Sequence, residues 1–69
     1  MERTAYDEGF TCGGYHVHDC RNRQFVSSDP DEIATEARAI FEIADKPEGA
    51  DIDEFVAGFL AGHEAALAA

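Results

Sequence analysis

Two short acidic sequences each stand directly before a run of apolar residues at helical spacing. Residues 29–32 read Asp-Pro-Asp-Glu and residues 51–54 read Asp-Ile-Asp-Glu. The first places an acid at the N-cap position, Pro at the first helical position and another acid at the third, as helix starts often do. Carboxylates at both starts also suit the positive end of the helix dipole. The sequence therefore predicts two helices of about four turns each, joined by a short loop that contains Pro47 and Gly49.

Both predicted helices carry an apolar stripe on one side, and a short connection makes them antiparallel neighbours. The second helix has a further face of small residues that includes Gly58 and Gly62. Glycine inside an exposed helix costs up to about 1 kcal/mol relative to Ala, so another backbone is expected to come close there. That backbone belongs either to the rest of the chain or to a second copy, in a homodimer through the Gly58/Gly62 face. The two stripes are Ile33, Ala37, Ile40, Phe41 and Ala44, and Ile52, Phe55, Val56, Phe59, Leu60, His63 and Leu67.

Residues 15–27 read as a β-hairpin. Tyr15 and Val17 alternate with two histidines, the pattern resumes at Phe25, and Asn22 suits the turn. Residues 10–12 could add a third strand, with Gly13 and Gly14 as the bend between them. The competing interpretation makes residues 2–12 a short helix, which Gly9 disfavours. We therefore predict an α+β fold: an N-terminal β-hairpin or short three-stranded meander, followed by two antiparallel amphipathic helices.

With 69 residues, the chain has room for one domain, residues 1–69, and a thin core. Such a core supplies roughly 3–5 kcal/mol, which favours an added staple such as a metal ion, a disulfide or a partner. An enzyme pocket would hollow out most of that core, so we do not expect an enzyme.

The charge of −10 is distributed unevenly along the chain. Residues 1–28 hold four acids and three bases, whereas residues 29–69 hold eleven acids and two bases. So acidic a chain is not expected to bind nucleic acid directly or to lie on an anionic membrane. The N-terminus has no apolar leader and the longest apolar run is too short to cross a bilayer. We expect a soluble cytoplasmic protein with reduced cysteines.

Four potential metal ligands, Cys12, His16, His18 and Cys20, lie within nine residues. Two Cys and two His are suitable donors for tetrahedral zinc, and His16 and His18 would share one face of a strand. The spacing nevertheless matches no Cys-x2-Cys knuckle or helical His pair. The alternative is a half-exposed strand with two histidines and two small thiols. A cysteine nucleophile would need an electropositive niche that the sequence does not place.

Two stretches of the chain echo each other. Gly9-Phe10-x-x-Gly13 matches Gly58-Phe59-x-x-Gly62, which is too short to be a repeat. Residues 5–10 and 55–59 also resemble ribosome modulation factor, which has an Ala-x3-Gly-aromatic stretch and a later aromatic-x2-Gly-aromatic stretch. The resemblance covers eleven of the 69 residues. That family is strongly basic and suited to RNA, whereas this chain carries −10, so its function is not expected here.

The acidity has two competing explanations, solubility and recognition. In the second, a dense carboxylate surface imitates a nucleic-acid backbone, as in small inhibitors that mobile elements encode. We predict a small acidic protein-binding inhibitor or adaptor that docks on a basic surface of a nucleic-acid-handling protein. The alternative is a zinc-stapled accessory module of a larger assembly. The expected contact residues lie away from the helix caps and apolar stripes; they are Glu36, Glu42, Glu48 and Glu64.

Overall fold

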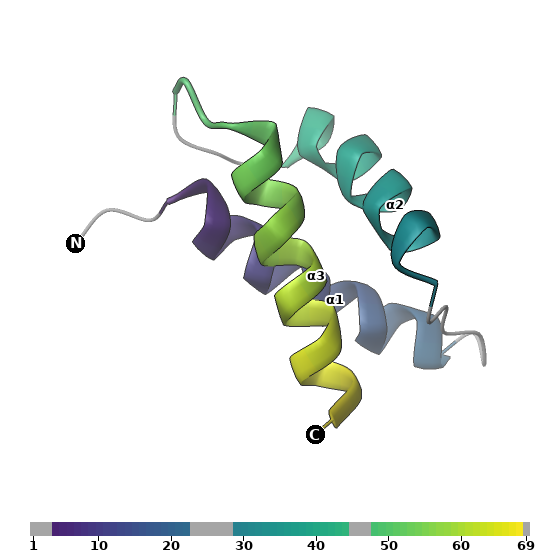
Figure 1. Cartoon of the computed structure of the whole chain (residues 1–69). Helices are drawn as coiled ribbons and strands as arrows, with labels where there is room; N and C mark the ends of the chain where they lie inside the picture. The colour runs from purple at the N-terminus through teal and green to yellow at the C-terminus, as the bar shows by residue number, and fades with distance from the viewer. Residues whose placement is uncertain (1–3, 23–28, 45–47, 69) are drawn as a thin grey trace.

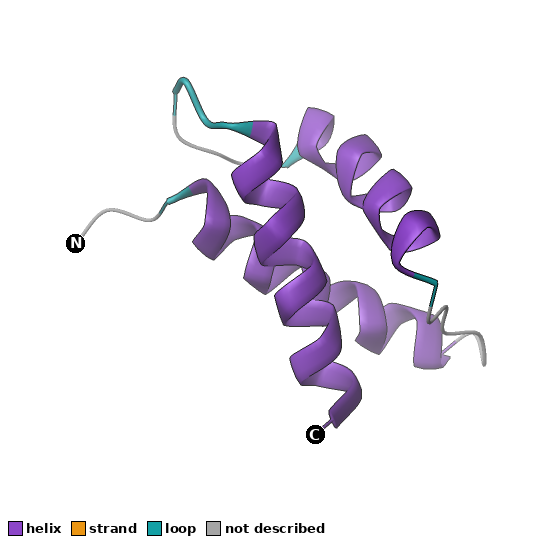
Figure 2. Ribbon diagram, in the orientation of Figure 1, coloured by secondary structure: helices purple, strands orange, loops and turns teal. Residues whose placement is uncertain are grey.

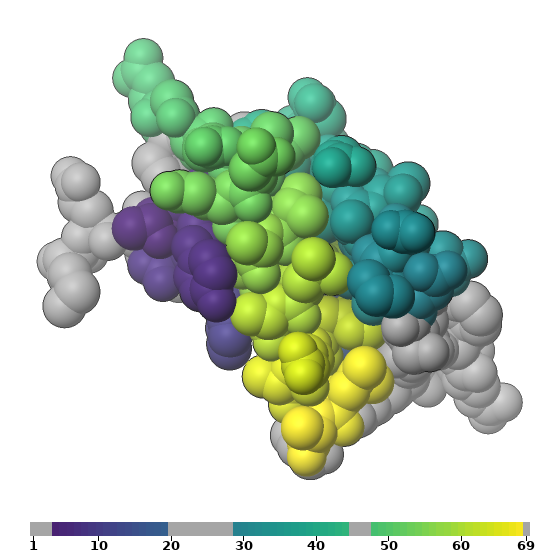
Figure 3. All heavy atoms as spheres, viewed as in Figure 1, coloured from purple at the N-terminus to yellow at the C-terminus, as the bar shows by residue number. Residues whose placement is uncertain are grey.

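The computed structural model describes residues 4–22, 29–44 and 48–68, and these residues form three helices (Figure 1). The helices are α1 (Ala5–Asn22), α2 (Pro30–Ile43) and α3 (Ile52–Ala68). Most contacts between helices join α3 to α1, fewer join α3 to α2, and α1 and α2 barely touch. In the space-filling view, α2 and α3 lie side by side (Figure 3). Among the described helices, none is long and apolar enough to span a membrane.

The predicted α+β class is wrong. Within the described residues there is no strand (Figure 2), and α1 occupies residues 10–22, where we expected the third strand and the first part of the hairpin. The rejected alternative, a helix over residues 2–12, was closer to the structure, although the helix runs ten residues further. Asn22, assigned to the hairpin turn, is the last residue of α1. Residues 24–26, predicted to form the second strand of the hairpin, lie outside the described residues.

A reciprocal pair of hydrogen bonds fixes the start of α1. The backbone N–H of Asp7 donates to the Thr4 hydroxyl at 3.1 Å, and the backbone N–H of Thr4 donates to the Asp7 carboxylate at 3.1 Å. This is a capping box, which satisfies donors that the first turn of a helix otherwise leaves unpaired. The Thr-x-x-Asp sequence was therefore a start signal in the segment where we predicted strands.

The starts of α2 and α3 are confirmed as predicted. Asp29 caps α2 by accepting from the backbone N–H of Asp31 at 3.0 Å, with Pro30 at the first helical position. Asp51 accepts from the backbone N–H of Asp53 at 2.8 Å, one residue before α3 begins. Gly49 forms the turn between the helices with a φ of +76°, a backbone conformation that glycine adopts without strain.

The core lies on the two sides of α3 that face α1 and α2. The rings of Phe41, near the end of α2, and Phe55, near the start of α3, meet edge to face at 5.2 Å. Ile33, near the start of α2, lines the same hollow as Leu67 near the end of α3, so the two helices are antiparallel as predicted. The predicted stripe of α3 is buried at Phe55, Val56, Phe59 and His63. The central hydrophobic cluster consists of Ala5, Ile33, Ala37, Phe55, Val56 and Phe59.

Four glycines let α1 and α3 cross with their backbones in contact. A Cβ on Gly9 would collide with the Phe55 carbonyl oxygen, and one on Gly13 with the Phe59 carbonyl oxygen. From the other helix, a Cβ on Gly58 or Gly62 would collide with a backbone carbonyl of α1. The close approach predicted for α3 is therefore real, and it occurs within the chain. The Gly58/Gly62 face is occupied by α1.

The two similar stretches noted in the sequence pack against each other in the structure. Each helix contributes an aromatic-x-x-Gly-Phe-x-x-Gly segment, residues 6–13 in α1 and residues 55–62 in α3. Each glycine of one segment meets the backbone of the other, so the two segments pack face to face. Such contacts bring Cα–H groups close to carbonyl oxygens, a recurring feature of tight helix–helix interfaces. The crossing is thus built from two similar halves.

Replacing one of the four glycines at the α1–α3 crossing by a larger residue should destabilise the protein. We expect Gly62→Ala or Gly9→Ala to cost about 2 kcal/mol or more, because a backbone carbonyl cannot rotate away from the new methyl group. Gly14→Ala is the matched control: it lies in α1 and nothing stands within 4 Å of its would-be Cβ. It should raise stability by up to about 1 kcal/mol through helix propensity. Thermal melts followed by circular dichroism measure all three, and equal effects would contradict the packing described.

Candidate functional site

The helical form of α1 separates two of the predicted zinc ligands. His16 is half-buried, whereas His18 is exposed. Two positions along a helix turn through about 200°, so these histidines point to opposite sides, whereas on a strand they would have shared a face. Cys12 lies one turn before His16 and packs against the core cluster. Cys20 lies one turn after His16, and its side chain is outside the described residues.

No group of three His, Cys, Asp or Glu side chains in the described part of the chain is placed to hold a metal ion. Because residues 16 and 18 lie in a helix, His16 and His18 do not share a face as they would on a strand. A zinc site on Cys12, His16, His18 and Cys20 therefore stays a prediction without geometric support, and metal analysis of the purified protein would test it.

The structure instead pairs His16 with His63 of α3, which the sequence analysis assigned only to the apolar stripe of that helix. Their ring centroids are 5.6 Å apart, and the His16 ring also lies 5.4 Å from that of Phe59. His63 is 1 % exposed, and its Nε2 atom has no hydrogen-bond partner among the residues that the structure describes. Burial, and secondarily the nearby His16, lower the pKa of His63 below its ordinary value of 6.5. The fold therefore holds a neutral histidine in its core.

The predicted contact glutamates are all exposed. Glu36 and Glu42 lie on α2, Glu48 lies in the turn before α3, and Glu64 lies on the C-terminal half of α3. Glu36 and Glu42 are six residues apart, so they leave α2 in different directions. The structure thus distributes these side chains over the outer surface of two helices and the turn before α3, and does not gather them into one cluster.

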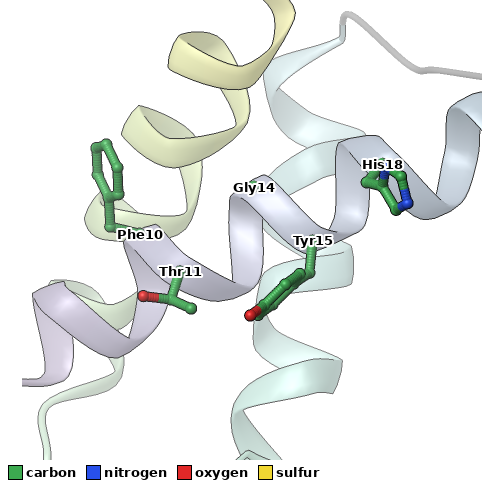
Figure 4. A pocket seen from close by; sticks show the side chains of 5 residues that line it. All are labelled: Phe10, Thr11, Gly14, Tyr15 and His18. Atoms are coloured by element: carbon green, nitrogen blue, oxygen red, sulfur yellow. The ribbon is translucent and has the colours of Figure 1, made fainter.

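An exposed aromatic surface on α1 is the feature that sequence reasoning missed. Tyr6, Phe10 and Tyr15 are 42 %, 43 % and 71 % exposed. A shallow hollow of about 550 Å³ is lined by Phe10, Thr11, Gly14, Tyr15 and His18. Phe10 and Tyr15 project from α1 on either side of Gly14 (Figure 4). The capping box at Thr4, with these residues then read at helical spacing, would have revealed this face.

Removing the buried imidazole tests the assigned state of His63. In the unfolded chain His63 takes up a proton near pH 6.5, whereas the folded protein resists that proton to a lower pH. Above about pH 6.5 His63 is neutral in both states, so its titration does not change the free energy of unfolding. As the pH drops below that value, the unfolded chain takes up the proton first and the folded protein loses stability. We expect His63→Leu to flatten this decline between about pH 7.5 and 5. It should cost little at neutral pH, because it also removes the unpaired Nε2. Urea unfolding across that range measures both; a decline as steep as in the parent protein would contradict the assignment.

Comparisons of the chain with family models, with curated proteins and with solved structures find no match.

Proposed function

We propose that this protein is a small protein-binding inhibitor or adaptor whose acidic surface docks on a basic surface of a nucleic-acid-handling protein. One observation carries the proposal. Residues 29–44 and 48–68 contain ten carboxylate side chains, all exposed, and a single described basic side chain, Arg38. These residues form α2, α3 and the turn between them, the two helices that dominate the face in Figure 3.

The position of the acids supports recognition by long-range electrostatics. The apolar sides of α2 and α3 face the core that they form with α1. The carboxylates therefore lie on the outer surface and take no part in the core. A surface of one charge sign raises the rate at which an oppositely charged partner is encountered. Nucleic-acid-handling proteins present such basic surfaces because phosphate contacts require Lys and Arg. A partner of that class would meet an acidic surface in place of its phosphate backbone.

Six of the exposed acids are better explained by folding. Asp29 and Asp51 accept hydrogen bonds at the helix starts. The other four lie in the first turns of α2 and α3; they are Asp31, Glu32, Asp53 and Glu54. Glu36, Glu42, Glu48 and Glu64 have no such role in the described structure and remain the proposed contact residues.

Charge reversal on α2 tests the proposal. Glu36→Lys with Glu42→Lys should leave the fold intact, since exposed changes usually cost within about 0.5 kcal/mol each. It should slow association with a captured basic partner by about tenfold or more at low salt, and the difference should shrink as ionic strength rises. The measurements are association rates at several salt concentrations, and competition by duplex DNA, which should displace the protein from a nucleic-acid-binding surface.

A matched control separates a specific surface from net charge. Glu36→Lys and Asp19→Lys change the charge equally and both positions are exposed, but Asp19 lies on α1. Only Glu36→Lys should slow association substantially. If both variants behave alike, or if binding survives the double reversal and is flat in salt, the acidity serves solubility and the proposal fails.

A further inference from the structure

The Nε2 atom of His63 is a buried polar atom that the fold leaves unused. The side chain is 1 % exposed, and among the described residues this nitrogen has no hydrogen-bond partner. Buried polar atoms nearly always have a partner, so an exception inside a core calls for a reason. When the neutral imidazole carries its proton on Nδ1, Nε2 offers a lone pair, and neutral imidazole is the commonest metal ligand in proteins.

A second imidazole lies beside the first. The ring centroids of His16 on α1 and His63 on α3 are 5.6 Å apart, and the ring planes are inclined by 38°. Two imidazole nitrogens that bind one metal ion at about 2 Å each hold their ring centroids roughly 5–6 Å apart, depending on the angle at the metal. The observed separation is therefore that of two rings able to share an ion. The exposed His18 points to the opposite side of α1.

The surroundings of the pair select the kind of ion. Zn²⁺ takes four ligands in a closed site, and elsewhere completes its shell with water, which does not reach the buried Nε2 of His63. Cu(I) is satisfied by two donors, and imidazole is one of the ligands that suit copper. A monovalent ion also costs less to bury than a divalent one. A site with two donors agrees with the finding that the described part of the chain places no group of three ligands around an ion.

We propose that His16 and His63 form a binding site for one monovalent copper ion, held between α1 and α3. Nε2 of His63 and one ring nitrogen of His16 are the two ligands, and His16, which is half-buried, lies on the side from which the ion enters. The ring of Phe59, 5.4 Å from that of His16, borders the site. Because the two ligands come from different helices, the ion joins α1 to α3 and stabilises the fold. The proposal does not depend on the acidic docking surface of α2 and α3.

Thiolates also bind Cu(I), so the binding test uses a chain with Cys12→Ala and Cys20→Ala. Titration without oxygen, in competition with a chromogenic Cu(I) chelator, should show one ion per chain. X-ray absorption of the complex should show two nitrogen neighbours. The ion should also raise the melting temperature by about 5 °C or more. A chain that takes no copper from the chelator, or an ion whose neighbours are mainly oxygen, overturns the proposal.

Three histidine variants of that chain assign the ligands. His16→Leu and His63→Leu should each weaken Cu(I) binding by about a hundredfold or more, and neither variant should melt at a higher temperature when Cu(I) is added. His18→Leu is the matched control, because it removes an exposed imidazole from the same helix. It should bind Cu(I) as tightly as the chain with three histidines. Equal effects of all three changes, or unaltered binding by His63→Leu, would contradict the assignment.

Silver(I) provides a test in the parent chain that requires no variant to fold. It shares the d10 configuration of Cu(I) and its preference for two ligands, and it is not oxidised in air. In ¹⁵N spectra of the imidazole rings, Ag(I) should shift and split the signals of one nitrogen of His16 and of Nε2 of His63. The His18 signals should stay in place. Unchanged His63 signals, or Zn²⁺ that shifts them as readily as Ag(I), would overturn the assigned site or the assigned ion.

Discussion

The contact of backbone with backbone where α1 crosses α3 is the interaction on which the rest of the molecule depends. It needs glycine at four positions, because a methyl group at any of them would meet a carbonyl of the other helix. Because α1 lies so close to α3, the large side chains of α3 lie beside the glycine contacts and are buried there. Phe55 and Phe59 are 0 % exposed, and the second inner side of α3 is left for Ile33 and Ala37 of α2. A chain of 69 residues thereby assembles a closed core from few large residues.

The same crossing explains the unusual surface of α1. Its inner side is made largely of small residues, Ala5, Gly9 and Gly13, together with Val17. The larger aromatic side chains of the helix, Tyr6, Phe10 and Tyr15, are consequently left partly or largely exposed. An amphipathic helix normally shows the reverse arrangement. The apolar outer face of α1 and the acidic outer surface of α2 and α3 thus lie on different helices.

The sequence predicted α2 and α3 because their signals are local: a capping aspartate, helical apolar spacing and a closing glycine at position 49. It failed for α1 because the inner face of that helix contains mostly small residues, which a hydrophobic pattern does not register, and because Gly9 argues against a helix unless another backbone passes there. Tertiary packing, which no local pattern contains, decided the conformation. Exposure of Glu36 and Glu42 could be predicted from the stripe of α2, whereas the contact of His16 with His63 required the crossing itself.

Proton contacts between the two backbones test the crossing most directly. A Cβ on Gly58 would lie against the Tyr6 Cα atom, and one on Gly62 against the Phe10 Cα atom, so the Hα protons of each pair must be close. The account predicts nuclear Overhauser effects between the Hα protons of Gly58 and Tyr6 and between those of Gly62 and Phe10, with helical chemical shifts through residues 5–22. Strand-like shifts in that segment, or helical shifts without these Hα–Hα effects, would contradict it.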